Sequence, residues 1–176
     1  MAKSRVAQLK PGNIVNFKIT KSGSTIIFLL QGLLVRRYGI SYTLADGSWL
    51  NFDKGITFFP VQHGHQITDA DGRLLRIDQY PKAKLLKDAI QFPEQLPKIG
   101  QPISATFMAI SQTPYTVEQI IGLREIICQG NKRVISIWLI VNPQGNQYER
   151  VIFKNNQFYA KDIMTGKEIE VKIKPL

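Results

Sequence analysis

Two histidines separated by a single glycine have the spacing that most resembles a metal-binding motif in this chain. His63 and His65 are followed by Asp69 and Asp71. Alternate residues of a strand point the same way, so two imidazoles at this spacing could hold a transition metal together with a carboxylate. The glycine and Pro60 favour a loop instead, and no glutamate follows at the distance that a calcium loop requires. We therefore expect neither a metal site nor a cofactor.

Catalytic motifs are missing from the sequence. It has no Gly-x-Ser-x-Gly elbow, no phosphate-binding Gly-x-x-x-x-Gly-Lys loop and no dinucleotide fingerprint. Cys128 is the only cysteine, which excludes an intrachain disulfide, and its place at the end of an apolar run favours packing over nucleophilic chemistry. We expect a protein that is not an enzyme. A hydrolase that uses His63 and His65 is the catalytic alternative.

A cluster of cations and aromatic residues suggests a different chemistry. Arg36, Arg37 and Tyr38 end a long apolar run, and Tyr42 and Trp49 follow in a predicted hairpin. If Leu50 points inward, Trp49 points outward beside the arginines. Aromatic stacking platforms next to phosphate-binding cations are typical of proteins that bind single-stranded nucleic acid. The alternative is that Trp49 packs under a loop or between two halves of the protein.

Other basic residues extend this prediction. Lys3, Arg5 and Lys10 form a basic arm before the first predicted strand, although an ordinary solvated tail would have the same composition. The second half of the chain offers cations and Tyr148 at a comparable place. The predicted nucleic-acid-binding residues are Lys3, Arg5, Lys10, Arg36, Arg37, Tyr38, Tyr42, Trp49, Lys132, Arg133 and Arg150.

The composition agrees with a folded, basic binding protein. Apolar residues make up 44% of the 176 residues, which excludes wholesale disorder, and the formal net charge is +10. Residues 1–98 hold 14 Lys and Arg against 7 Asp and Glu, and residues 99–176 hold 9 against 6. Such an excess favours a polyanionic partner. Nucleic acid is the first expectation, and an acidic protein partner of an interaction or assembly module is the alternative.

The N-terminus and the apolar segments bear on localisation. The first ten residues are basic but lack the apolar region of a secretory signal. The most apolar stretch, Ile26 to Val35, is half the length that a membrane-spanning helix needs. We expect a cytoplasmic protein without a membrane partner.

Most of the chain has the pattern of short strands joined by tight turns. β-branched and aromatic residues alternate with polar ones, and Asp46-Gly47 and Asp71-Gly72 have the composition of hairpin turns. The predicted strands are 14–20, 25–37, 40–45, 48–52, 57–59, 66–68, 74–77, 103–110, 117–128, 134–141, 147–154, 157–162 and 168–173.

The order of these strands repeats after about 90 residues. Lys10-Pro11-Gly12 corresponds to Lys98-Ile99-Gly100, and Gly32 to Gly122, where each long strand is expected to bend. Glycine-bearing turns are common in any β-rich chain, which is the alternative explanation. We predict a mainly β protein with two tandem small barrels, SH3-like or OB-like, from an internal duplication. Their expected limits are 1–92 and 93–176.

One short helix is expected between the two barrels. Residues 82–90 follow a proline and contain good helix formers, and Pro93 would end the helix. Its lysines could line the binding face or simply solvate the helix. The linker lysines are Lys82, Lys84, Lys87 and Lys98.

Overall fold

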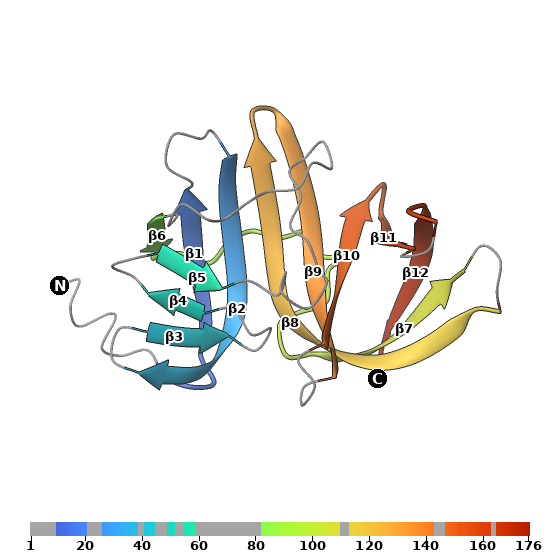
Figure 1. Cartoon of the computed structure of the whole chain (residues 1–176), viewed down its shortest axis with the longest axis horizontal. Coiled ribbons are helices and arrows are strands. Elements are labelled where there is room, and N and C mark those ends of the chain that lie inside the picture. Colours follow the sequence, from blue (N-terminus) through green and yellow to red (C-terminus); the bar gives the residue numbers. More distant parts are fainter. Residues whose placement is uncertain are drawn as a thin grey trace.

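The computed structural model has twelve strands and, in the part of the chain that it describes, no helix (Figure 1). It describes residues 10–20, 26–38, 41–44, 49–51, 55–58, 82–109, 113–142, 147–162 and 165–176. The strands are β1 (Ile14–Thr20), β2 (Ile26–Tyr38), β3 (Ser41–Leu44), β4 (Trp49–Asn51), β5 (Gly55–Phe58), β6 (Lys82–Leu85), β7 (Pro102–Met108), β8 (Tyr115–Gln129), β9 (Lys132–Asn142), β10 (Gln147–Lys154), β11 (Gln157–Lys161) and β12 (Glu168–Pro175). The expected mainly β class is confirmed.

The last six strands form a closed antiparallel barrel, called here the C-terminal barrel. Each of β7 to β12 pairs with the next, and β12 pairs with β7. Buried residues alternate along β7, as expected for a strand with one face inside a barrel. All six strands contribute apolar side chains to one buried cluster, for example Ile103, Ile121, Ile137, Val151, Ala160 and Ile169.

The first six strands, called here the N-terminal half, pair in the same succession. β1 pairs with β2 and β6, and β2, β3, β4 and β5 pair in order. β5 lies close to β6. In both halves, therefore, the first strand lies between the second and the sixth. The buried apolar residues of this half include Val15, Phe17, Phe28, Leu30 and Leu34.

The long second strands of the two halves join them into one twelve-stranded sheet. Residues 26–32 of β2 pair with residues 123–129 of β8 in antiparallel register. Figure 1 shows β2 and β8 side by side between the two groups of strands. The length of β2 follows from its three partners, because its first part pairs with β1 and β8 and its last part pairs with β3.

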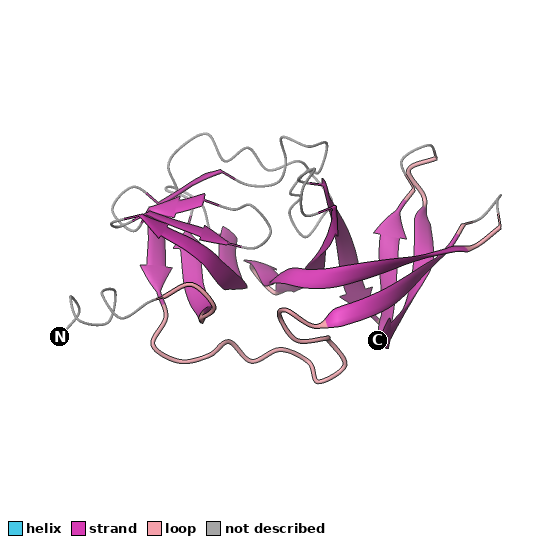
Figure 2. Cartoon of the chain, turned by 90° about the horizontal axis from the view of Figure 1, so that it is seen from below, coloured by secondary structure: helices cyan, strands magenta, loops and turns pink. Residues whose placement is uncertain are grey.

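The expected helix over residues 82–90 is wrong. Lys82–Leu85 forms β6 and pairs with β1, so hydrogen bonding to a strand edge outweighs the intrinsic helix preference of these residues. The segment from Leu86 to Gln101, called here the connector, has no regular structure. Figure 2 shows it as a loop that runs along both groups of strands.

A tight turn precedes β1. Gly12, with φ of +95°, donates its backbone N–H to the Leu34 carbonyl at 2.7 Å, and Leu34 N–H donates to the Asn13 carbonyl at 2.9 Å. The Asn13 side-chain oxygen accepts the Lys10 N–H at 2.9 Å. These bonds attach the turn to the middle of β2.

The turn before β7 has the same bonds. Gly100, with φ of +80°, donates its N–H to the Ile121 carbonyl at 2.8 Å, and Ile121 N–H donates to the Gln101 carbonyl at 3.3 Å. The Gln101 side-chain oxygen accepts the Lys98 N–H at 3.0 Å. Each bonded residue in this turn lies 88 positions after its counterpart, and Ile121 lies 87 positions after Leu34.

The glycines of the two long strands, Gly32 and Gly122, occupy different positions in the strand pairing. The register of β8 shifts at Gly122, between Ile121 and Leu123, whereas the register of β2 shifts at Val35. Gly32 lies in regular pairing with both β1 and β8. Strand pairing therefore matches Gly122 with Val35, not with Gly32 as the sequence comparison expected.

Candidate nucleic-acid interface

Strand register brings two of the predicted binding residues into one row. Arg36 on β2 is paired with Thr43 on β3, and Thr43 is paired with Trp49 on β4. Directly paired residues share a face of the sheet, and two strand spacings separate positions 36 and 49 by about 10 Å. Arg36 is exposed, and the row of positions that shares its face is called here the outer row. Trp49 is described by its backbone only.

The other predicted residues of this sheet divide between its two faces. Tyr38 is paired with Ser41 and lies two residues beyond Arg36, so its position shares the face of the outer row. Arg37 is paired with Tyr42 in a row on the opposite face. The structure describes the backbone of these three predicted residues and not their side chains.

Lys10 belongs to the turn before β1. This turn is bonded to Leu34, two residues before Arg36, and Lys10 is exposed. The turn therefore lies on the β1 side of β2, and position 49 lies two strands away on the other side. Lys3 and Arg5 lie outside the described residues.

Arg150 lies in a buried polar cluster. The Glu125 side chain has no solvent exposure, and its Oε1 lies 3.0 Å from Arg150 Nε. The same oxygen accepts hydrogen bonds from Ser136 Oγ at 2.6 Å and Trp138 Nε1 at 3.2 Å. Burial of a carboxylate requires such partners. The guanidinium of Arg150 neutralises a buried charge, and we do not include it in the interface proposed below.

One residue in the sequence could have indicated this cluster. It is Glu125, and the prediction from sequence did not use it. It is the one acid within the apolar run from Ile120 to Cys128. Both faces of this part of β8 are buried, and a buried carboxylate is stable only beside a cation or hydrogen-bond donors. Its partner lies 25 positions further on, and only the pairing of β8, β9 and β10 brings the two together.

Lys132 and Arg133 begin β9, directly after the turn at Gly130 that ends β8. Both are exposed. Arg133 is paired with Cys128, which is half-buried and in turn paired with Ile27 of β2. These cations therefore belong to the sheet that joins the two halves, away from the outer row.

A ladder of polar side chains crosses this joining sheet. Gln31 Nε2 donates to Asn16 Oδ1 at 2.9 Å, and Arg124 Nε donates to Gln31 Oε1 at 2.9 Å. The connector lies over this ladder, because Ile90 N–H donates to Asn16 and the Arg124 guanidinium stacks 4.3 Å from the Phe92 ring. Burial lowers the pKa of Arg124 from its ordinary value. The ladder fixes the connector to both halves.

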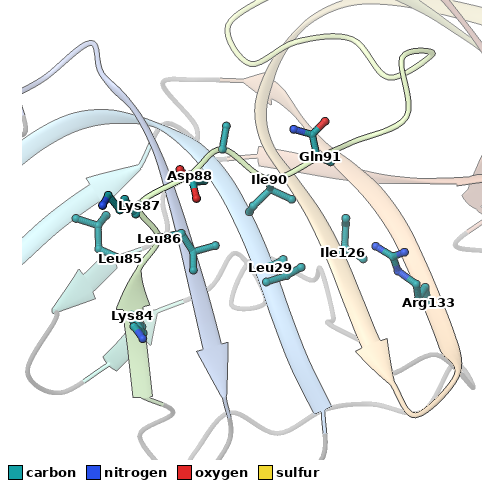
Figure 3. A pocket seen from close by; sticks show the side chains of 11 residues that line it. Leu29, Lys84, Leu85, Leu86, Lys87, Asp88, Ile90, Gln91, Ile126 and Arg133 are labelled. Atoms are coloured by element: carbon teal, nitrogen blue, oxygen red, sulfur yellow. The ribbon is translucent and has the colours of Figure 1, made fainter.

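Beside the ladder, the connector and the joining sheet enclose an open groove of about 690 Å³, called here the junction groove (Figure 3). Its aliphatic part includes Leu29 on β2 and Ile126 on β8, together with Leu86 and Ile90 of the connector. Its charged residues are Lys84, Lys87, Asp88 and Arg133. None of its lining residues is aromatic.

A second group of titratable residues lies in the C-terminal barrel. Burial raises the pKa of Glu149 from 4.5 to about 7. Burial also raises the pKa of Tyr115, and the charges of Glu149 and Asp162 raise it further. The Tyr115 ring stacks on Phe107 with 5.1 Å between the centroids.

The described residues contain no group of three or more His, Cys, Asp and Glu side chains that could hold a metal ion. His63 and His65 lie outside that part of the chain. None of the elements that the structure describes is a helix with the length and apolar character needed to cross a membrane. Comparisons with protein-family models, curated proteins and solved structures find no match to this chain.

Proposed function

We propose that this protein is a non-catalytic, cytoplasmic binding protein for single-stranded DNA or RNA, and that the outer row is its binding surface. The observation that carries the proposal is the register that aligns Arg36, Thr43 and Trp49 across three neighbouring strands. A stacked base contributes roughly 1–3 kcal/mol, and an arginine about 10 Å away can contact a neighbouring phosphate.

The distribution of charge favours a polyanionic ligand for the N-terminal half. Strands β1 to β6 contain lysine and arginine and no aspartate or glutamate. The net charge of the chain is +10, and exposed Lys10 lies in the turn that is bonded to Leu34, two residues before Arg36. Phosphates that replace counterions along such a surface bind with an affinity that falls as salt rises.

Fluorescence anisotropy with a labelled oligothymidylate of about 15 nucleotides tests the proposal at about 50 and 200 mM salt. The wild-type protein is expected to bind, more weakly at the higher salt. Trp49→Ala is expected to weaken binding about tenfold or more, whereas Trp49→Phe retains a stacking ring and most of the affinity. Arg36→Glu is expected to weaken binding and to reduce its salt dependence.

Lys167→Glu is the matched control for Arg36→Glu, because Lys167 is an exposed cation in a turn of the C-terminal barrel. It should bind the oligonucleotide as the wild type does. Equal losses in Arg36→Glu and Lys167→Glu would reduce the proposal to a general effect of charge. An absence of binding at low salt would refute it.

We also infer that the two halves arose by duplication of a unit of about 88 residues. The support is the common strand succession, the two equivalent turns and the register shifts at Val35 and Gly122, which lie 87 positions apart. By strand pairing, β6 precedes its counterpart in β12 by 88 positions as well, because Phe17 faces Leu85 and Ala105 faces Ile173.

A further inference from the structure

A row of directly paired residues crosses the sheet at the junction groove. Lys84 on β6 is paired with Lys18 on β1, and Lys18 with Leu29 on β2. The row continues through Ile126 on β8 to Ile135 on β9. Paired residues share a face, so two lysines stand side by side at one end of an aliphatic row.

Like charges directly opposite each other destabilise a sheet. Neither Lys18 nor Lys84 forms an ion pair with any described residue, and the same holds for Lys87 and Arg133 at the groove. Asp88 is the one acid in its lining. The groove thus places these cations beside an aliphatic floor in which Leu29, Leu86 and Ile90 are half-buried and Ile126 is buried, and its complement is an acidic ligand with aliphatic groups.

The dimensions suit an extended peptide. Lys84 and Arg133 stand on the first and last of five adjacent strands, which separates them by about 19 Å. An extended chain advances about 3.3 Å per residue, so roughly six residues span that distance. Leu29, Leu86, Ile90 and Ile126 line the space between the two ends.

We propose that the junction groove binds an extended acidic segment of another protein, with aliphatic side chains against Leu29 and Ile90 and carboxylates at Lys84 and Arg133. Two features favour a peptide over nucleic acid at this place. Single-stranded nucleic acid needs aromatic platforms for its bases, and the groove lining has none. The cations of the groove lie at the two ends of its floor, whereas a nucleic-acid backbone needs cations along one continuous path.

The groove is held open by contacts outside it. The ladder of Asn16, Gln31 and Arg124 attaches the connector to both halves, and Phe92 stacks on Arg124. The site is therefore formed before the ligand arrives, which lowers the entropic cost of binding. This proposal is independent of nucleic-acid binding at the outer row, because the two surfaces share no residue.

Isothermal titration calorimetry with a capped peptide of roughly nine residues tests the proposal; the peptide has glutamates at both ends and leucine and isoleucine between them. The wild-type protein is expected to bind it and to reject the same peptide with lysines in place of the glutamates. The Lys84→Glu/Arg133→Glu variant should bind the acidic peptide about tenfold more weakly and gain affinity for the lysine peptide. That gain would exclude misfolding as the cause of the loss.

The control is Lys167→Glu, which changes charge away from the groove and should leave both affinities unchanged. Equal binding of the acidic and lysine peptides, or no binding of the acidic peptide at about 1 mM, would overturn the proposal. So would displacement of the peptide by oligothymidylate together with lost oligonucleotide binding in Lys84→Glu/Arg133→Glu. In that case the groove is a nucleic-acid site. The Arg36→Glu result is unaffected by any of these outcomes.

Discussion

The outer row of the N-terminal half has a counterpart in the C-terminal barrel with the opposite environment. Strand pairing matches positions 36, 43 and 49 with Leu123, Trp138 and Arg150. Arg36 is exposed, whereas Leu123 and Trp138 are fully buried. Each row contains one arginine and one tryptophan. The strand pairing is the same in both rows, so the surroundings of each row decide whether its arginine is exposed or mostly buried.

The halves also differ in their acids. Strands β1 to β6 have none, while β8, β10 and β12 carry all the glutamates that lie on strands of the C-terminal barrel. Glu125 on β8 is the acid that accommodates Arg150 inside the structure. The strands of the N-terminal half therefore carry cations without strand acids to pair with them, which agrees with the proposed ligand-binding role of that half.

Replacing the arginine of each row should give the largest difference in the free energy of unfolding between the two halves. Arg150→Met leaves Glu125 buried without its cation, and we expect a loss of about 3–5 kcal/mol in the free energy of unfolding. Arg36→Met changes an exposed side chain and should cost less than about 0.5 kcal/mol. Urea unfolding of both variants measures the difference. Similar costs for the two would show that the rows are not distinct. Glu125→Gln/Arg150→Met should regain part of the loss.

Much of the fold was predictable because it depends on local patterns. The alternation in 168–173 and the turn residues before 14–20 mark strands that the structure contains. The failures lie where pairing partners decide. Residues 82–85 have helix-forming side chains but pair with β1, and Gly32 resembles Gly122 in sequence but not in register.

The candidate sites divide in the same way. Arg36 and Trp49 were predicted together from residue type, and register places them in one row. The burial of Arg150 was missed, because its partner Glu125 lies 25 positions earlier in the sequence and only strand pairing brings the two together. The junction groove was missed too, since its residues come from four strands, β2, β6, β8 and β9, and from the connector.

The C-terminal barrel should also make stability depend on pH, because among the strands only those of this barrel carry an acid with a shifted pKa. The pKa of Glu149 is raised by burial to about 7, above its ordinary 4.5, so folding opposes ionisation. Stability should fall as pH rises from about 4.5 to 7, by up to about 3 kcal/mol. Glu149→Gln should remove this dependence and be the more stable protein at about pH 8. Urea unfolding between about pH 4 and pH 9 measures it, and an unchanged profile in Glu149→Gln would assign the dependence to another group.

The two turns allow a test of equivalence between the halves. Gly12 and Gly100 have φ of +95° and +80°, a region that residues with a Cβ rarely adopt, and open space surrounds both. Gly12→Ala and Gly100→Ala should therefore each cost about 1–2 kcal/mol through backbone strain alone. Thermal or urea unfolding gives both values. A large cost at one glycine and none at the other would contradict the equivalence of the turns.

The smallest expected effect probes the side chains that close these turns. The Asn13 and Gln101 side chains each accept the backbone N–H three residues earlier, at Lys10 and Lys98, in exposed positions. Asn13→Ala and Gln101→Ala should each reduce the free energy of unfolding by about 0.5–1 kcal/mol. The exchanged variants Asn13→Gln and Gln101→Asn keep an acceptor and should cost less than the alanine variants. If the alanine variant is costly in one turn only, the side-chain bond stabilises that turn alone, and the common geometry of the two turns comes from their glycines and from their backbone bonds to β2 and β8.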